Sequence, residues 1–196
     1  QRSASAGYAP AQYQLASGYE RGKGVEKDVA RARTWYRRAA EQGHVRAMHN
    51  LAVLGVSQPG VAPDYAGSLV LFRKAAEYGL VDSQFNLALL YASGLGVKRN
   101  GFESYRWFGL AAAGGDKEAA KRKQEARTRL SPDAIAKADK LIRAFKAKTA
   151  IPAVNEAASE DEVIAGTAAV LPSSDPGLAA AEVNMVQGLL GKLGYD

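Results

Sequence analysis

The 196-residue chain contains no cysteine, and it has only two histidines and seven prolines. The lack of cysteine excludes disulfide bonds, although it neither proves nor excludes an oxidising compartment. No stretch approaches the roughly 20 apolar residues that a helix needs to cross a membrane, and no signal peptide is visible. The first residue is Gln1 rather than Met, so we expect the chain to be a fragment whose targeting signals have been removed.

Catalytic chemistry finds little support in the residue pattern. His44 and His49 lie five residues apart, without a cysteine or carboxylate at the spacing of a metal site. No serine lies in a nucleophile elbow, and the glycine-rich loops lack the lysine and serine of a phosphate-binding loop. The sequence therefore predicts no enzyme activity, no metal site and no cofactor.

What the chain has instead is an internal repeat. Positions 11, 47, 83 and 119 begin successive units at a constant spacing of 36 residues, and the same residue types return at the same offsets. Self-similarity at this period is the signature of a helical solenoid. The matching sets are Leu15, Leu51 and Leu87; Tyr19, Gly55 and Tyr91; Asp28, Asp64 and Asn100; Ala32, Ser68 and Ser104; Trp35, Leu71 and Trp107; and Gly43, Gly79 and Gly115.

Each unit is predicted to form a pair of helices. In the first unit, small and apolar residues between positions 11 and 19 recur at helical spacing. Gly22 and Gly24 end that helix because glycine tolerates a positive φ. Asp28 can then cap a second helix, which ends at Gly43. One pair cannot bury its apolar face alone, so stacking of the units is obligatory.

These residues resemble the Sel-one-like repeat (SLR) family, a branch of the tetratricopeptide repeat (TPR) superfamily. The family pattern A-x-x-x-L-G/A-x-x-Y-x-x-G-x-G-V-x-x-D-x-x-x-A-x-x-W-Y-x-x-A-A-x-x-G fits repeats 1 and 3 nearly throughout. In repeat 2, Gly55 replaces the tyrosine and the loop lacks its first glycine, so we expect a distorted turn. The resemblance implies an all-α, right-handed helical solenoid of three SLR/TPR-like helix pairs plus C-terminal capping helices. Without cysteines, the disulfide-rich secreted branch of the family is not a close analogy.

We expect four segments along the chain: residues 1–120 as three 36-residue repeats, 121–148 as capping helices, 149–176 as an acidic Ala/Pro linker, and 177–196 as the truncated start of a further domain. The last capping helix is expected from Ala134 to Lys148, after an N-cap at Ser131. Its apolar face would cover repeat 3, and comprises Ile135, Ala138, Leu141, Ile142 and Phe145. The linker is expected to be disordered.

The C-terminal segment carries a second resemblance. Leu178 to Asp196 looks like the opening helix of a peptidoglycan-binding domain, V-x-x-V/L-Q-x-x-L-x-x-L-G-Y, and an ordinary amphipathic helix is the alternative. The order of repeats, acidic linker and this motif is similar to the periplasmic end of PodJ-type polar localization factors of alphaproteobacteria. That resemblance implies a periplasmic location in a membrane-anchored parent and a role in polar localization and organelle development.

Charge is unevenly distributed. Residues 1–150 carry 25 Lys and Arg against 13 Asp and Glu, whereas residues 151–196 carry one against seven. Such a surface could attract an acidic protein, an anionic wall polymer or membrane headgroups, and a solvated outer helix face is the alternative. No aromatics interleave with the basic residues as in a nucleic-acid interface, so no nucleic-acid partner is predicted. The basic residues singled out are Arg31, Arg33, Arg37 and Arg38.

The resemblance also indicates where a partner would bind. In tetratricopeptide solenoids the concave surface is lined by the first helix of each pair, so its variable positions are candidates for contact with a protein or peptide ligand. Val53, Phe85 and Leu89 would form an apolar strip, unless they only pack between neighbouring first helices. The full candidate set is Tyr13, Ser17, Glu20, Arg21, His49, Val53, Phe85 and Leu89.

Three functions remain open at this point. The first is a non-enzymatic adaptor that recruits a protein through the concave surface. The second is a wall-associated module that holds peptidoglycan, and the third is an accessory or regulatory subunit of a cell-wall enzyme.

Overall fold

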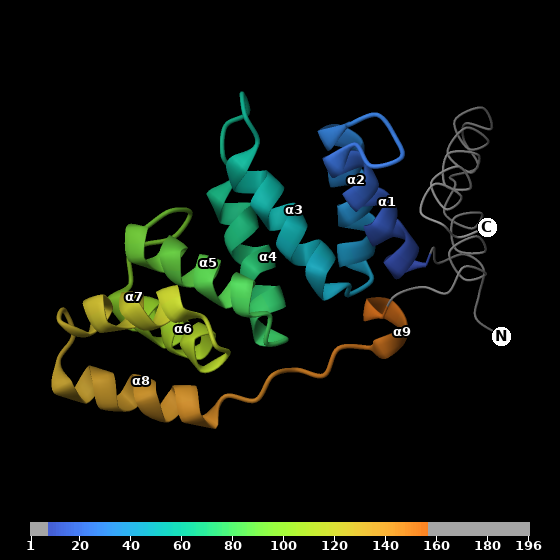
Figure 1. Ribbon diagram of the computed structural model, residues 1–196. Helices are drawn as coiled ribbons and strands as arrows, with labels where there is room; N and C mark the ends of the chain where they lie inside the picture. Colours follow the sequence, from blue (N-terminus) through green and yellow to red (C-terminus); the bar gives the residue numbers. More distant parts are fainter. Residues whose placement is uncertain (1–7, 157–196) are drawn as a thin grey trace. The chain divides into compact units, whose positions relative to one another are not determined.

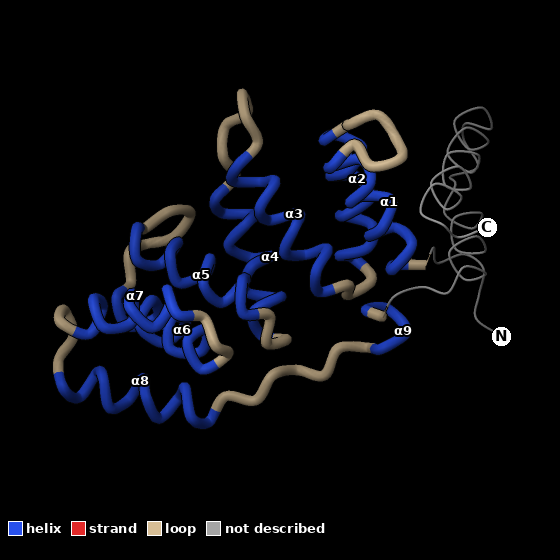
Figure 2. The backbone as a smooth tube through the Cα atoms, in the orientation of Figure 1, coloured by secondary structure: helices blue, strands red, loops and turns tan. Residues whose placement is uncertain are grey.

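The computed structural model describes residues 8–156, which form helices and loops without a strand (Figures 1 and 2). The C-terminal motif and most of the expected linker lie outside the described residues. The described helices are α1 (Ala9–Arg21), α2 (Val29–Glu41), α3 (Val45–Ser57), α4 (Tyr65–Glu77), α5 (Val81–Ser93), α6 (Gly101–Ala113), α7 (Lys117–Arg127), α8 (Pro132–Ala144) and α9 (Pro152–Asn155). They divide into two compact units, residues 8–47 with 150–156, and residues 48–149.

The second helix of each repeat begins with the same hydrogen bonds. Asp28, Asp64 and Asn100 each accept a hydrogen bond from the backbone N–H three residues on, at 2.9, 2.8 and 3.1 Å. This satisfies an amide that the helix itself leaves without a partner. The backbone N–H groups of the same three residues donate to the carbonyls of Tyr19, Gly55 and Tyr91. The cap therefore fixes both the start of one helix and its return to the helix before it.

The loop of repeat 2 differs from those of repeats 1 and 3. α1 and α5 are followed by left-handed glycines, Gly22 at φ 68° and Gly94 at φ 73°. In repeat 2 the first left-handed residue after α3 is Gly60, at φ 75°. The difference between the loops ends at Asp64, whose N–H donates a hydrogen bond of 2.8 Å to the Gly55 carbonyl, as the equivalent residues do in the other repeats.

The core of the first unit lies between α1 and α2. Tyr19 and Tyr36 are almost completely buried, with exposed fractions of 1% and 0%. Around them pack small residues such as Ala16 and Ala39, which let the two helices approach closely. The short helix α9 lies against α1 in the same unit.

The second unit has a continuous core that runs from α3 through α6 and includes Ala119 of α7. Its members are Ala52, Leu69, Phe72, Ala76, Leu87, Ala88, Leu90, Tyr91, Trp107, Phe108, Leu110, Ala111 and Ala119. Every repeat position that the sequence marks as apolar in α5 and α6 contributes to it, as stacking of the pairs requires.

The helices α7 and α8 cover α6, as the capping prediction requires (Figure 1). Ile142 and Phe145 pack against the core, and the Phe145 ring meets the Trp107 ring edge to face at 6.3 Å. The expected last helix to Lys148 is too long, because Phe145 already has an extended backbone and α8 ends at Ala144. Leu141, placed on the apolar face by the sequence pattern, is 42% exposed.

Residues 145–151 form an extended segment between α8 and α9 (Figure 2). In the second unit, the Lys148 N–H donates to the Glu77 carbonyl at 2.9 Å, and Lys148 Nζ lies 2.6 Å from Glu77 Oε2. Glu77 ends α4, so this stretch of chain lies along the turn between α4 and α5.

Candidate functional site

The four candidate residues of α1 lie in the first unit. Tyr13, Ser17 and Glu20 are half-buried, and Arg21 is exposed at the end of the helix. The Glu20 carboxylate accepts a hydrogen bond of 2.6 Å from the Tyr36 hydroxyl of α2. The Glu20 side chain is therefore held against α2 of its own hairpin. Tyr13 is the aromatic residue among the four candidates on α1.

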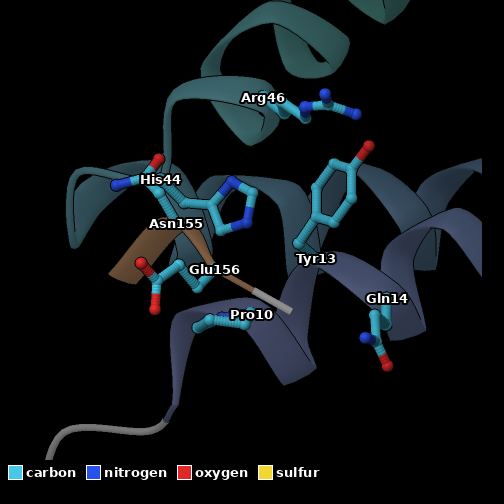
Figure 3. Close-up of a pocket in the computed structure, with 7 residues that line it drawn as sticks. All are labelled: Pro10, Tyr13, Gln14, His44, Arg46, Asn155 and Glu156. Carbon is cyan, nitrogen blue, oxygen red and sulfur yellow. The ribbon is translucent and has the colours of Figure 1, made fainter. Parts of the chain in front are cut away.

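Tyr13 lines a pocket of about 310 Å³ at one end of the first unit (Figure 3). Its ring stacks on the His44 ring, with centroids 4.5 Å apart and planes inclined by 16°. The other residues that line the pocket are Pro10, Gln14, Arg46, Asn155 and Glu156. The pocket thus combines an aromatic wall with polar side chains from the α2–α3 turn and from α9.

His44 is buried and contacts the start of α3. Its side chain is 3% exposed, and Nδ1 accepts a hydrogen bond of 3.2 Å from the Ala47 N–H in the first turn of α3. Burial lowers the pKa of His44 to about 4; a hydrogen bond of its own backbone opposes the shift, and the positive charge of Arg46 adds to it. The neutral imidazole therefore caps α3.

Asn155 is a pocket residue that the sequence reasoning missed. Its Oδ1 accepts a hydrogen bond of 2.7 Å from the Val45 N–H, and its Nδ2 lies 3.4 Å from the Gly43 carbonyl. No local pattern could reveal this contact, because it joins positions 110 residues apart. The only signal nearby is Pro152, which starts the single helical turn that presents Asn155.

The other four candidate residues lie in the second unit, on α3 and α5. Val53, Phe85 and Leu89 are half-buried and pack against the core with one side, and Phe85 meets Phe108 edge to face at 5.6 Å. These side chains therefore pack between helices and still leave apolar surface uncovered.

His49 links α3 to two other helices. Its Nδ1 lies 2.8 Å from the Ser83 hydroxyl of α5, and its ring meets Phe72 of α4 edge to face at 5.6 Å. Burial lowers its pKa, partly opposed by the negative charge of Asp82. This polar residue thus sits at the edge of the apolar strip and is fixed by its own neighbours.

The four basic residues of α2 are not equivalent. Arg31 forms an ion pair of 3.3 Å with Asp28, and Arg38 lies over the Trp35 ring at 4.5 Å. Arg33 is half-buried and Arg37 is exposed. Arg31 and Arg38 therefore make contacts within their own hairpin, and Arg37 is the exposed member of the set.

A larger group of basic side chains lies on α7, on α8 and in the segments that follow each of them. Between residues 117 and 148, Lys and Arg outnumber Asp and Glu by eleven to four. Lys123 is the exception that faces inward, since its Nζ lies 3.2 Å from Asp139, which also accepts a hydrogen bond of 2.9 Å from the Tyr105 hydroxyl. Lys121, by contrast, has a side chain that is 75% exposed.

Within residues 8–156, no cluster of three or more His, Asp or Glu side chains could hold a metal ion. Over the same part of the chain, no helix combines the length and the apolar character needed to cross a membrane.

The geometry defines a class of protein. Hairpins of two 13-residue helices, repeated with the same caps and closed by an additional helix pair, make an α-helical repeat protein. The Sel1 repeat profile matches residues 9–44, 45–79 and 81–116, which is more than half of the chain. The chain therefore belongs to the Sel1 repeat family, and the predicted all-α SLR fold is confirmed.

One of the solved structures that the chain matches agrees with this assignment. A Sel1 repeat protein from Oxalobacter formigenes is 34% identical, with a TM-score of 0.56, over 62% of this chain and 92% of that chain. A protective antigen of uropathogenic Escherichia coli strains, which displays an SLR fold, is 23% identical with a TM-score of 0.48, over 73% of this chain and 42% of that chain. No curated protein matches at a significant level. Sel1 repeats are generally non-catalytic scaffolds for protein–protein interaction.

Proposed function

We propose that this chain is a periplasmic scaffold that recruits a protein partner through the first helices of its repeats, in the service of polar localization and organelle development. The observation that carries the proposal is the uncovered apolar surface of Val53, Phe85 and Leu89. These side chains lie on the same helices as fully buried core residues such as Leu87. An apolar strip on a rigid helix surface suits a partner helix or an extended peptide.

The compartment and the cellular role are supported by the sequence alone. The C-terminal motif resembles the start of a peptidoglycan-binding domain, and the order of segments resembles PodJ-type polar localization factors. A scaffold with this organisation would act on the periplasmic side of a membrane-anchored parent protein. Epitope-tagged parent protein, tested for protease accessibility in spheroplasts, would contradict the location if the repeats were protected.

Capture from periplasmic extract tests the partner site. The 196-residue chain is compared with the triple variant Val53→Ala/Phe85→Ala/Leu89→Ala, and we expect the variant to lose at least tenfold of the captured partner. A matched control is Val70→Ala/Leu95→Ala, which removes exposed apolar side chains outside the candidate set. Far-UV circular dichroism must show that all three proteins are folded. Equal capture by the triple variant and the control would contradict the proposed surface.

A second candidate function rests on the basic exterior of α7 and α8. Eleven Lys and Arg against four Asp and Glu between residues 117 and 148 would attract an anionic wall polymer. Binding to purified sacculi would then fall steeply between about 50 mM and about 300 mM salt, because screening weakens interactions between exposed charges. Capture through the apolar strip would survive the same change, which separates the two functions.

A further inference from the structure

The chain carries its own ligand at the turn between α2 and α3. Asn155, from the single turn of α9, lies at the start of α3 and is held by two backbone groups of that turn, the Val45 N–H and the Gly43 carbonyl. The contact joins positions 110 residues apart, and it belongs entirely to the first unit.

The two backbone groups match one kind of side chain. The Val45 N–H requires an acceptor and the Gly43 carbonyl requires a donor, and a carboxamide supplies both from a single planar group. A carboxylate would accept from Val45 but would face the Gly43 carbonyl with a second oxygen. A hydroxyl has one heavy atom and cannot reach both groups. The turn is therefore shaped for asparagine or a side chain of the same chemistry.

The rest of α9 supports the same contact. Asn155 Nδ2 also lies 3.1 Å from the Ile151 carbonyl, and the Glu156 N–H donates to the Pro152 carbonyl at 2.9 Å. These bonds hold residues 151–156 as a closed turn, and the carboxamide of Asn155 contacts both this turn and the α2–α3 turn. Asn155 and Glu156 also line the pocket that contains the stacked rings of Tyr13 and His44 (Figure 3).

We propose that the α2–α3 turn and its pocket are a binding site for a short peptide turn that presents an asparagine, and that residues 151–156 occupy this site within the chain. A partner peptide of the same chemistry would have to displace them. This site belongs to the first unit and shares no residue with the apolar strip of Val53, Phe85 and Leu89, so it does not depend on the partner proposed above.

The first test measures hydrogen exchange at a single amide in the full chain. Asn155→Ala removes the acceptor of the Val45 N–H, so we expect that amide to exchange at least tenfold faster. The Ala119 N–H, which Asp116 caps at 2.9 Å in the second unit, should be unaffected. Ile151→Ala is the matched variant, because the Ile151 side chain is 61% exposed and only its backbone takes part. An unchanged Val45 exchange rate in Asn155→Ala would overturn the proposal.

The second test supplies the ligand in trans. A synthetic peptide of residues 150–156 is titrated into full-length Asn155→Ala, into full-length Ile151→Ala and into the unchanged chain. We expect binding to Asn155→Ala at least tenfold tighter than to the other two, whose own tail fills the site. The same peptide with alanine or aspartate in place of asparagine should bind at least tenfold more weakly. Equal binding to all three proteins, or no preference for the asparagine peptide, would overturn the proposal.

Discussion

The second helices of repeats 1 and 3 are equivalent in sequence position but carry different outer faces. α2 presents Arg33 and Arg37, whereas the same positions of α6 are Tyr105 and Gly109. Tyr105 is completely buried, and the α-carbon of Gly109 faces Ile142 of α8 so closely that an added Cβ would collide with that side chain. A repeat hairpin can thus carry on this face either charged side chains, as in α2, or the contact surface for a further helix, as in α6.

The largest loss of stability should come from replacing Gly109 of α6 by arginine, the residue at the equivalent position of α2. In Gly109→Arg the new side chain would occupy the space of Ile142, so α8 could not dock, and we expect a loss of about 4 kcal/mol in the free energy of unfolding. The reciprocal change, Arg37→Gly, removes an exposed side chain and should cost only about 1 kcal/mol through helix propensity. Urea denaturation followed by circular dichroism measures both. Equal losses would refute the contrast between the two faces.

The residues that cap α3 and α7 differ in how they respond to pH. His44 and Asp116 are equivalent caps, and each accepts the backbone N–H three residues on. The pKa of His44 is about 4 in the folded chain, below its ordinary 6.5, so the unfolded state takes up a proton first. The contribution of neutral His44 to the free energy of unfolding is therefore fully present above pH 6.5 and is lost as the pH falls toward 4. The loss amounts to about 3 kcal/mol, at about 1.4 kcal/mol per pH unit.

Urea denaturation at about pH 7.5 and about pH 4.5 measures that loss. The control is the variant His44→Asp, in which α3 receives the same capping residue as α7. We expect most of the acid sensitivity to disappear in this variant. The remaining part would come from His49, whose pKa is also lowered by burial. If His44→Asp keeps the full pH dependence of the unchanged chain, the cap is not the acid-sensitive group.

A smaller effect distinguishes the loops of repeats 2 and 3. Gly60 and Gly96 both have a positive φ, at 75° and 68°. A Cβ at Gly96 would lie 2.6 Å from the Ala66 backbone nitrogen, whereas one at Gly60 would meet no atom within 4 Å. Gly60→Ala should therefore cost about 1 kcal/mol from backbone strain alone, and Gly96→Ala about 2 kcal/mol more. Thermal melts of the two variants would contradict this if their midpoints coincided.

The repeat pattern predicted the parts of the fold that depend on local chemistry. Asp28, Asp64 and Asn100 cap their helices as their spacing indicates, because the cap involves only neighbouring residues. Gly109 was not predicted as a docking point, since a glycine inside a helix is not distinguishable by pattern from a merely tolerated one.

The candidate site was predictable to a lesser degree. Tyr13 could be placed on α1 from the repeat alone, but its stacking on His44 depends on how the α2–α3 turn folds back. The contact of Asn155 with Val45 has no counterpart in the other repeats, so periodicity carried no information about it. The end of α8 was misplaced for a similar reason, because Phe145 leaves the helix to reach Trp107.

The smallest effect concerns the polar tie between α8 and α6. Asp139 accepts a hydrogen bond from Tyr105 and lies 3.2 Å from Lys123, contacts that α2 cannot make because Arg33 stands at the position of Tyr105. Burial raises the pKa of Asp139, but the hydrogen bonds from Tyr105 and Lys123 and the charges of Lys123 and Arg143 outweigh it, and the net pKa is lowered. Its contribution is therefore present at neutral pH and is lost as the pH falls through that lowered pKa.

Asp139→Asn should cost about 1 kcal/mol at pH 7, because it weakens one hydrogen bond and one partly exposed ion pair. Glu125→Gln makes the same change of charge on α7, where the side chain of Glu125 is 65% exposed, and should cost almost nothing. Urea denaturation at neutral and acid pH measures both variants, and the difference between them should vanish once Asp139 is protonated. A difference that persisted in acid would contradict this, because it could not come from the ionised carboxylate that Tyr105 and Lys123 contact.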